Sequence, residues 1–233
     1  MTDRPILFSA PMIRALIAGR KTQTRRVIRR APNDGWWIYH DGERCGWSNG
    51  GGGMVPDTSQ TPYQQGDRLW VREQCATWGV GPGPEPVSYP VAYAADDKEW
   101  NQIKRDAKAA KDEWKIRPSI HMPRWASRLT LIVTDVRVQR LHDLSEKDAL
   151  AEGITAQSMI IGSHCASGVH TEVHAERFFN GTESDDHDGY EDGIDAYAAL
   201  WNRLNGDGAW DANPWVVAVS FGVLLGNIDE VRS

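Results

Sequence analysis

The sequence has little cysteine. Its three cysteines, Cys45, Cys75 and Cys165, are far apart and odd in number among 233 residues. A disulfide scaffold needs paired cysteines, and a zinc knuckle needs two cysteines a few positions apart. The cysteines therefore argue against both kinds of protein. They favour a reducing compartment, and we expect a cytoplasmic protein.

The sequence also has no long apolar run. No stretch approaches the roughly 20 apolar residues that a membrane-spanning helix needs. Its first residues, Met-Thr-Asp-Arg-Pro, do not read as a secretory signal, so we expect no membrane partner. Hydrophobic residues make up 40% and charged residues 25%, as in ordinary globular proteins. A chain of 233 residues can bury a core without disulfides or a metal.

Positive charge is confined to one short segment. Residues 1–30 hold eight Arg or Lys and one Asp, a net charge of +7, which leaves −13 for the rest of a chain of net charge −6. Proteins that grip long duplex DNA are usually basic over a broad face. The pattern instead favours a local polar or anionic ligand, a small nucleic-acid element, or a solvated basic face.

The apolar pattern predicts scattered strands and few helices. We expect strands at 5–8, 22–28, 68–73, 91–94, 127–141 and 214–223, and helices after Ser9 and at 97–113, 144–153 and 194–204. Three segments interrupt this pattern as insertions: 31–64, expected to be a long loop, 79–125 and 155–192. We therefore predict an α+β fold, a single domain over 1–233 that forms a small β-barrel with helices packed on it.

Lys21 and Thr24 lie at the junction between a predicted helix and a predicted strand. A threonine hydroxyl is a poor nucleophile until a base removes its proton. A lysine amine acts as that base when burial or neighbouring arginines lower its pKa. Along the strand, Thr22, Thr24 and Arg26 share one face. The spacing alone is a weak signal and is more typical of a solvated basic strand.

Glu152 ends the predicted helix 144–153, immediately before Gly153. A carboxylate at that position opposes the negative end of the helix dipole. The placement is mildly unfavourable, so it indicates either a functional carboxylate or an ordinary exposed glutamate.

Histidines gather in the insertion 155–192, at His164, His170, His174 and His187. On a helix, His170 and His174 would lie on one face, as zinc ligands do. Glycine and serine break the segment, and it has no His-Glu-x-x-His pattern. We therefore expect no metal site and no cofactor.

The sequence is rich in tryptophan, with eleven. Trp125 ends a loop-like segment that begins at Arg117 and contains two prolines. Aromatic faces stack on nucleobases for about 1–3 kcal/mol each. We expect most tryptophans in the core and Trp125 among the one or two that contact a ligand.

A string of short blocks resembles one known family. The blocks are Gly19-Arg20-Lys21-Thr22-x-Thr24-x-Arg26, Gly66-Asp67-x-Leu69-x-Val71, Val133-Thr134-Asp135-Val136, Leu144-Ser145-Glu146-Lys147-Asp148-Ala149-Leu150-Ala151-Glu152 and the strand Trp215–Phe221, where x is any residue. In this order they resemble the ASCH-domain proteins, which have a PUA-like β-barrel. Within that family the chain is similar to the small bacterial N4-acetylcytidine amidohydrolases and to longer phage- and metagenome-type members.

The resemblance implies a catalytic set of Lys21, Thr24 and Glu152. It implies hydrolysis of the amide of N4-acylated cytosine or cytidine, a small-molecule substrate, without a metal or cofactor. We expect substrate contacts from four residues, Thr22, Arg26, Glu73 and Trp125. Glu73 is also a rival for the role of catalytic carboxylate. The insertions would widen the acyl pocket for groups bulkier than acetyl.

Two alternatives stay open from the sequence. In the first, Lys21 and Glu152 activate water directly and Thr24 only positions it. In the second, the chain is an RNA-binding PUA-like module, with Lys21 and Arg26 on phosphate and Thr24 on sugar, or a ribonuclease. RNA binding would fall steeply with salt, whereas hydrolysis of a neutral nucleoside would not.

Overall fold

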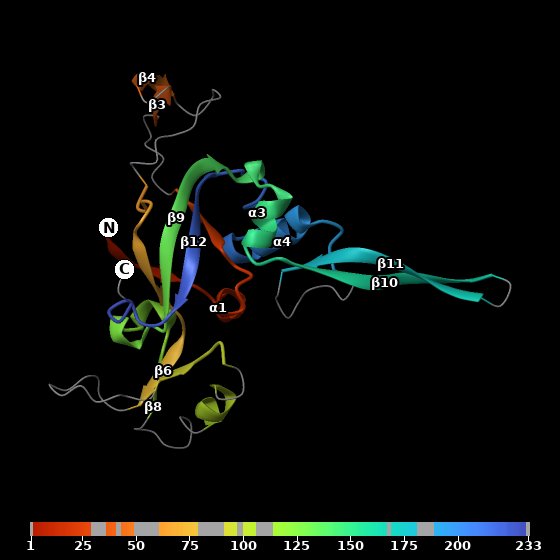
Figure 1. Cartoon of the computed structure of the whole chain (residues 1–233), viewed down its shortest axis with the longest axis horizontal. Helices are drawn as coiled ribbons and strands as arrows, with labels where there is room; N and C mark the ends of the chain where they lie inside the picture. The colour runs from red at the N-terminus through yellow and green to blue at the C-terminus, as the bar shows by residue number, and fades with distance from the viewer. Residues whose placement is uncertain are drawn as a thin grey trace. The chain divides into compact units, whose positions relative to one another are not determined.

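A computed structural model describes residues 2–28, 36–40, 43–48, 61–78, 91–96, 100–105, 114–166, 169–180 and 189–231 (Figure 1). The chain divides into two compact units. Unit 1 comprises Met1–Gly19, Gly66–Val133 and Phe221–Ser233, and unit 2 comprises Arg20–Gln65 and Thr134–Ser220. The prediction of one domain over 1–233 remains a prediction.

Strands and helices are both present, which confirms the α+β class. The strands are β1 (Asp3–Leu7), β2 (Gln23–Val27), β3 (Trp36–His40), β4 (Glu43–Ser48), β5 (Arg68–Arg72), β6 (Cys75–Trp78), β7 (Val91–Tyr93), β8 (Trp114–Arg117), β9 (Leu129–Arg140), β10 (Thr155–Ala166), β11 (Val169–Phe179) and β12 (Trp215–Leu225). The α-helices are α1 (Ala10–Ile17), α3 (Glu146–Ala151) and α4 (Gly193–Asn205), with a further helical stretch at 100–105. The largest sheet has the order β1-β5-β9-β12-β2. The described strands do not close into the predicted barrel.

Unit 1 contains β1, which runs parallel to β5, while β5 pairs antiparallel with β9. The helix predicted after Ser9 is α1, and it has the expected proline in its first turn. Ser9 is its N-cap residue, yet its side chain makes no capping hydrogen bond. Gly19 follows the helix at φ +70, a conformation that glycine adopts without strain. A second sheet places β6 between β7 and β8.

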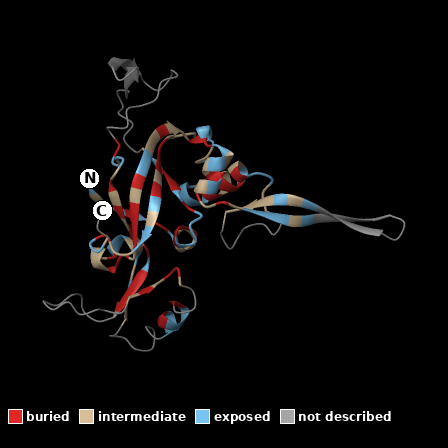
Figure 2. Cartoon of the chain, viewed as in Figure 1, coloured by how far each residue is buried: buried red, intermediate tan, exposed pale blue. Residues whose placement is uncertain are grey.

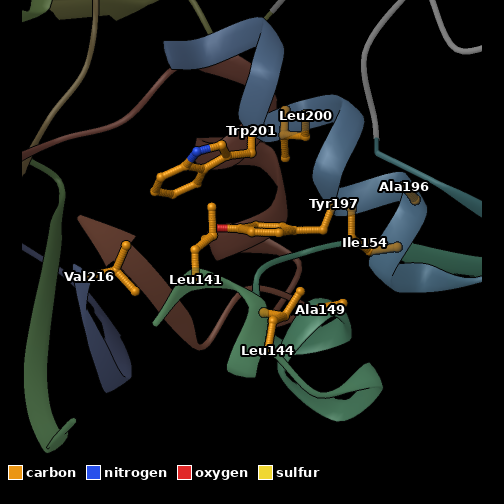
Figure 3. Packing of buried hydrophobic residues seen from close by; sticks show 9 residues of the cluster. All are labelled: Leu141, Leu144, Ala149, Ile154, Ala196, Tyr197, Leu200, Trp201 and Val216. Carbon is orange, nitrogen blue, oxygen red and sulfur yellow. The ribbon is translucent and has the colours of Figure 1, made fainter. Parts of the chain in front are cut away.

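Unit 2 packs α3 and α4 around an apolar cluster. Its buried members, shown in Figure 3, are Leu141, Leu144, Ala149, Ile154, Ala196, Tyr197, Leu200, Trp201 and Val216. The α4 residues recur at helical spacing and so present one apolar face. Leu204 continues the same spacing in the sequence but is 51% exposed. The helix ends one residue later, so Leu204 lies beyond the cluster.

The insertions contain more regular structure than the sequence predicted. Residues 31–64, expected to be a loop, include β3 and β4, which pair antiparallel. The insertion 155–192 contains the antiparallel pair β10 and β11. Both segments are rich in aromatic or β-branched residues, which favour strands over loops. The helix expected at 97–113 is present at 100–105, and the rest of that prediction lies outside the described residues.

The hairpin of β10 and β11 leads away from α3 and α4 (Figure 1). No hairpin residue whose exposure the structure gives is buried, whereas buried residues gather on α4 and on the strands of the large sheet (Figure 2). Across the described part of the chain, no helix is both long enough and apolar enough to cross a membrane.

Candidate active site

Lys21 and Glu152 meet in unit 2 although 131 positions separate them in the sequence. Lys21 Nζ donates a hydrogen bond to Glu152 Oε2 at 2.7 Å. Their side chains are only 1% and 3% exposed. Burying two charges is favourable only when each is closely paired, and this contact provides the pairing. Two of the three residues expected to act in catalysis are therefore in direct contact.

Local sequence explains why Glu152 is presented at this point. Ser145 and Asp148 form a capping box that starts α3. Glu152 is the C-cap residue, and Gly153 follows it at φ +106, which stops the helix. The helix predicted at 144–153 is present at 146–151, with Ser145 as its N-cap residue.

The residues before β2 bind the carbonyls at the end of α3. The pairs are Arg20 Nη1 to the Gly153 carbonyl oxygen at 3.4 Å, Lys21 Nζ to that of Glu152 at 2.8 Å, and the Thr22 amide to that of Ala151 at 2.8 Å. Helix ends leave such carbonyls without partners inside the helix, and cations there interact favourably with the dipole. These donors offset the unfavourable placement of Glu152 that the sequence indicated. They also fix the backbone on either side of Lys21.

Arg25 completes the site, although the sequence analysis considered it only among the arginines that could lower the pKa of Lys21. Its guanidinium is 0% exposed, and Nη1 donates to Glu152 Oε1 at 3.1 Å and to Gln23 Oε1 at 2.6 Å. Arg25 Nη2 lies 3.2 Å from Asp148 Oδ2. Arg137 Nη2 donates to the other carboxylate oxygen of Asp148 at 2.9 Å. Charges thus alternate in sign from Lys21 through Glu152, Arg25 and Asp148 to Arg137.

The electrostatics shift Lys21 toward the neutral amine. Burial lowers the pKa of Lys21, and the positive charges of Arg26 and Arg25 lower it further. The carboxylate of Glu152 opposes this effect, but the net direction is downward. A lysine with a lowered pKa can accept a proton at a pH where an exposed lysine cannot.

Tyr197, on α4, is a second residue that the sequence analysis did not assign to the site. We expected it in the core because it belongs to the apolar face of its helix, and it does belong to the buried cluster. Burial raises the pKa of Tyr197 well above 10, and the negative charge of Glu152 and a side-chain hydrogen bond with it act in the same direction. A buried tyrosine hydroxyl usually needs a hydrogen-bond partner, and this requirement could have indicated that Tyr197 lies beside a polar group such as Glu152.

Thr24 is buried in β2, opposite Val219 of β12. Side chains alternate along a strand, so Thr24 and Arg26 lie on the face opposite to that of Arg25. Arg26 is half-buried, and its charge acts on Lys21. Thr22 precedes the strand and is exposed, so it does not share the strand face that the sequence predicted.

The other two expected substrate contacts, Glu73 and Trp125, belong to unit 1. The Glu73 carboxylate is bound at both oxygens by Arg128, at 2.9 and 3.1 Å. Burial raises the pKa of Glu73, and Arg128 opposes that rise. Trp125 is half-buried against a cluster that contains Cys75 and Met122.

The histidine segment is a strand pair and not a helix. His174 lies on β11, opposite Ile160 of β10, and is exposed. His170 lies on the same strand, opposite Cys165, so the two histidines cannot share a helical face. The side chains of His164 and His170, and the whole of His187, lie outside what the structure describes. Among the described residues, no group of three or more His, Cys, Asp or Glu is arranged to hold a metal ion.

Comparisons of the chain with protein-family models, with curated proteins and with solved structures found no match. The candidate site is therefore interpreted from its own geometry.

Proposed function

We propose that this chain is an ASCH-type protein of PUA-like fold that hydrolyses the amide of N4-acylated cytidine or cytosine. The observation that carries the proposal is the contact of Lys21 Nζ with Glu152 Oε2 at 2.7 Å, in surroundings that lower the pKa of the lysine. Base and carboxylate come from two of the sequence blocks on which the resemblance rests. Their burial also supports chemistry, because charge interactions strengthen where water is excluded.

The proposed reaction begins with neutral Lys21, which accepts the proton of the Thr24 hydroxyl. The threonine oxygen then attacks the carbonyl carbon of the N4-acyl group. The C–N4 bond breaks, and the leaving nitrogen takes a proton from the Lys21 ammonium. Water hydrolyses the acyl-threonine, releasing a carboxylic acid and restoring Thr24. Glu152 orients Lys21 throughout.

A variant of the same reaction uses water as the nucleophile. Lys21 and Glu152 then activate a water molecule directly, and Thr24 positions it. The placement of Thr24 on the face of β2 opposite to Arg25 supports this route, because Arg25 binds the same carboxylate as Lys21. An acyl-enzyme detected by mass spectrometry after rapid quenching would favour the threonine route, and its absence during turnover would favour water.

The experiment follows release of cytidine from N4-acetylcytidine and from N4-benzoylcytidine. Lys21→Ala and Glu152→Ala should each lower kcat/KM by about 10²–10⁴-fold, since general-base catalysis contributes on that order. Arg140→Met is the matched control, because Arg140 lies in unit 2 with its guanidinium 4.5 Å from the ring centre of Trp215. Turnover should survive EDTA. Folded wild-type protein that releases no cytidine from either compound would refute the proposal.

The RNA-binding alternative receives less support from the same site. It required Lys21 to contact phosphate, yet Lys21 is buried and bound to Glu152. Arg26, the other residue that this alternative places on phosphate, is half-buried. Binding of a short single-stranded RNA that weakens steeply between 50 and 200 mM salt would revive this alternative.

A further inference from the structure

The Glu152 carboxylate is shared between two cations. Lys21 binds Oε2 at 2.7 Å, and Arg25 binds Oε1 at 3.1 Å. Arg25 Nη1 also donates to Gln23 Oε1 at 2.6 Å, and Arg25 Nη2 forms an ion pair with Asp148 Oδ2 at 3.2 Å. Gln23 is anchored in turn by Ser220, whose Oγ accepts from Gln23 Nε2 at 3.1 Å. Because the guanidinium is planar and fixed at these points, it constrains where the carboxylate can lie.

We infer that Arg25 is a positioning residue of the candidate site: by binding Oε1 of Glu152 it aims Oε2 at the Lys21 amine and keeps the carboxylate from serving Lys21 alone. The role as part of a catalytic site rests on the proposed function, whereas the positioning itself does not. Arg25 lies on the strand face opposite to Thr24, so it acts through Glu152 and not through the threonine.

The groups around Lys21 come from four elements. From β2, Arg25 and Arg26 contribute positive charge. From α3 come the carboxylates of Glu152 and Asp148, from α4 the phenol of Tyr197, and from β9 the guanidinium of Arg137, which acts by way of Asp148. Removing Arg25 leaves Glu152 to neutralise Lys21 alone and removes a nearby positive charge. Both changes stabilise the ammonium form of Lys21.

The test measures Lys21 directly, in the full-length protein. Lysine is labelled with ¹³C at Cε, the Lys21 signal is assigned by its loss in Lys21→Arg, and its chemical shift is followed from pH 6 to pH 11. In Arg25→Met the titration of Lys21 should move to higher pH than in wild type. Arg25→Lys, which restores the positive charge, should move it back toward the wild-type curve. Arg140→Met should leave it unchanged.

Arg25→Met removes the buried cation that pairs with Asp148 and Glu152, and this loss can prevent folding. The double variant Arg25→Met with Asp148→Asn removes one charge of each sign and is measured beside it. A Lys21 titration that is unchanged in a folded Arg25→Met or double variant would overturn the inference.

Kinetics then separate the inference from the proposed function. If the wild type hydrolyses N4-acetylcytidine, the acid limb of its kcat/KM profile should move to higher pH in Arg25→Met, with a loss of about tenfold or more near pH 7. If the wild type shows no hydrolysis but the Lys21 titration still moves, the proposed function fails and the positioning role stands. If the wild type hydrolyses N4-acetylcytidine but the Lys21 titration does not move in Arg25→Met, the proposed function stands and the positioning role fails.

Discussion

Unit 1 and unit 2 each bury a glutamate against cationic side chains. In unit 1, Arg128 binds both oxygens of Glu73 and also both oxygens of Asp96, at 2.7 and 3.1 Å. Its guanidinium further lies 3.9 Å from the ring centre of Tyr93. In unit 2, the two oxygens of Glu152 are divided between a lysine and an arginine.

The difference lies in which cation can lose its proton. Arginine stays protonated in proteins, so every oxygen of Glu73 is committed to a group that does not titrate. The amine of Lys21 does titrate, and its surroundings push it toward the neutral form. A buried carboxylate is therefore a candidate for catalysis when the cation that it binds can lose a proton. Glu152 meets this condition, and its rival Glu73 does not.

The largest expected effect on stability belongs to the Arg128 cluster. Arg128→Met should lower the free energy of unfolding by about 3–5 kcal/mol, because it leaves the buried Glu73 without a counter-charge. Urea unfolding measures the change. Arg105→Met, at an exposed position of unit 1, is the matched control. A loss below about 1 kcal/mol would mean that the contacts of Arg128 with Glu73 and Asp96 do not stabilise the fold as expected.

Lys21→Met should cost less, about 1–3 kcal/mol, since Arg25 still binds Glu152 and only Oε2 loses its partner. The pH dependence sharpens this comparison. Because the pKa of Lys21 is lowered in the folded chain, the unfolded chain binds more protons, and the free energy of unfolding rises with pH up to about 10.5. Lys21→Met should flatten that rise, as urea unfolding at a series of alkaline pH values would reveal. An equally steep rise in the variant would contradict the lowered pKa.

Asp148 should make the unit 2 cluster sensitive to acid. Burial raises its pKa, but the hydrogen bond from Arg137 and the charge of Arg25 lower it to about 2 on balance. Its contribution is present above pH 3.8 and is lost as the pH falls toward 2. We expect about 1–2 kcal/mol, reduced by solvent screening, to disappear over that range in wild type but not in Asp148→Asn. Thermal unfolding at stepped pH measures it, and identical acid profiles would reject it.

The smallest expected effect concerns the cap of α3. Ser145→Ala should lower the free energy of unfolding by about 1 kcal/mol, because the Asp148 amide loses the serine oxygen that it reaches at 3.2 Å. Hydrogen exchange should speed up in α3 and leave β5 and β6 of unit 1 unchanged. Ser145→Thr keeps a hydroxyl and is the conservative control. Equal acceleration in both units would show that the cap acts on the whole chain and not on the unit 2 site.

Local signals in the sequence account for the parts of the fold that depend on a few neighbouring residues. The cap at Ser145 and the helix stops at Gly153 and Gly19 could be predicted because each acts within one turn of backbone. Alternation located β5, β9 and β12, which correspond to predicted strands. The same reasoning missed β3, β4, β10 and β11. The neighbouring Gly, Ser and acidic residues favoured a loop or an insertion there, although residues that favour strands were also present.

The candidate site was only partly readable. Lys21 and Glu152 could be named from sequence blocks, although their contact could not be derived from spacing. Arg25 was passed over because alternation separates it from Thr24, and Tyr197 because its helix pattern marks it as core. The resemblance favoured Glu152 over Glu73, but the local sequence around the two residues did not, since each ends or follows a regular element and the difference lies in their partners.

By itself, then, the sequence determined that α1, α3 and α4 form, to within about two residues at their ends, and which face of α4 turns inward. It also determined which residues were available as base and carboxylate. Only the tertiary structure decided which carboxylate meets the lysine, and that the positive charge of Lys21 and Arg25 is turned inward. Caps, alternation and glycine conformations act over a few residues, whereas Lys21 and Arg25 reach Glu152 across 131 and 127 positions. Contacts of that separation exist only after the strands and helices have packed.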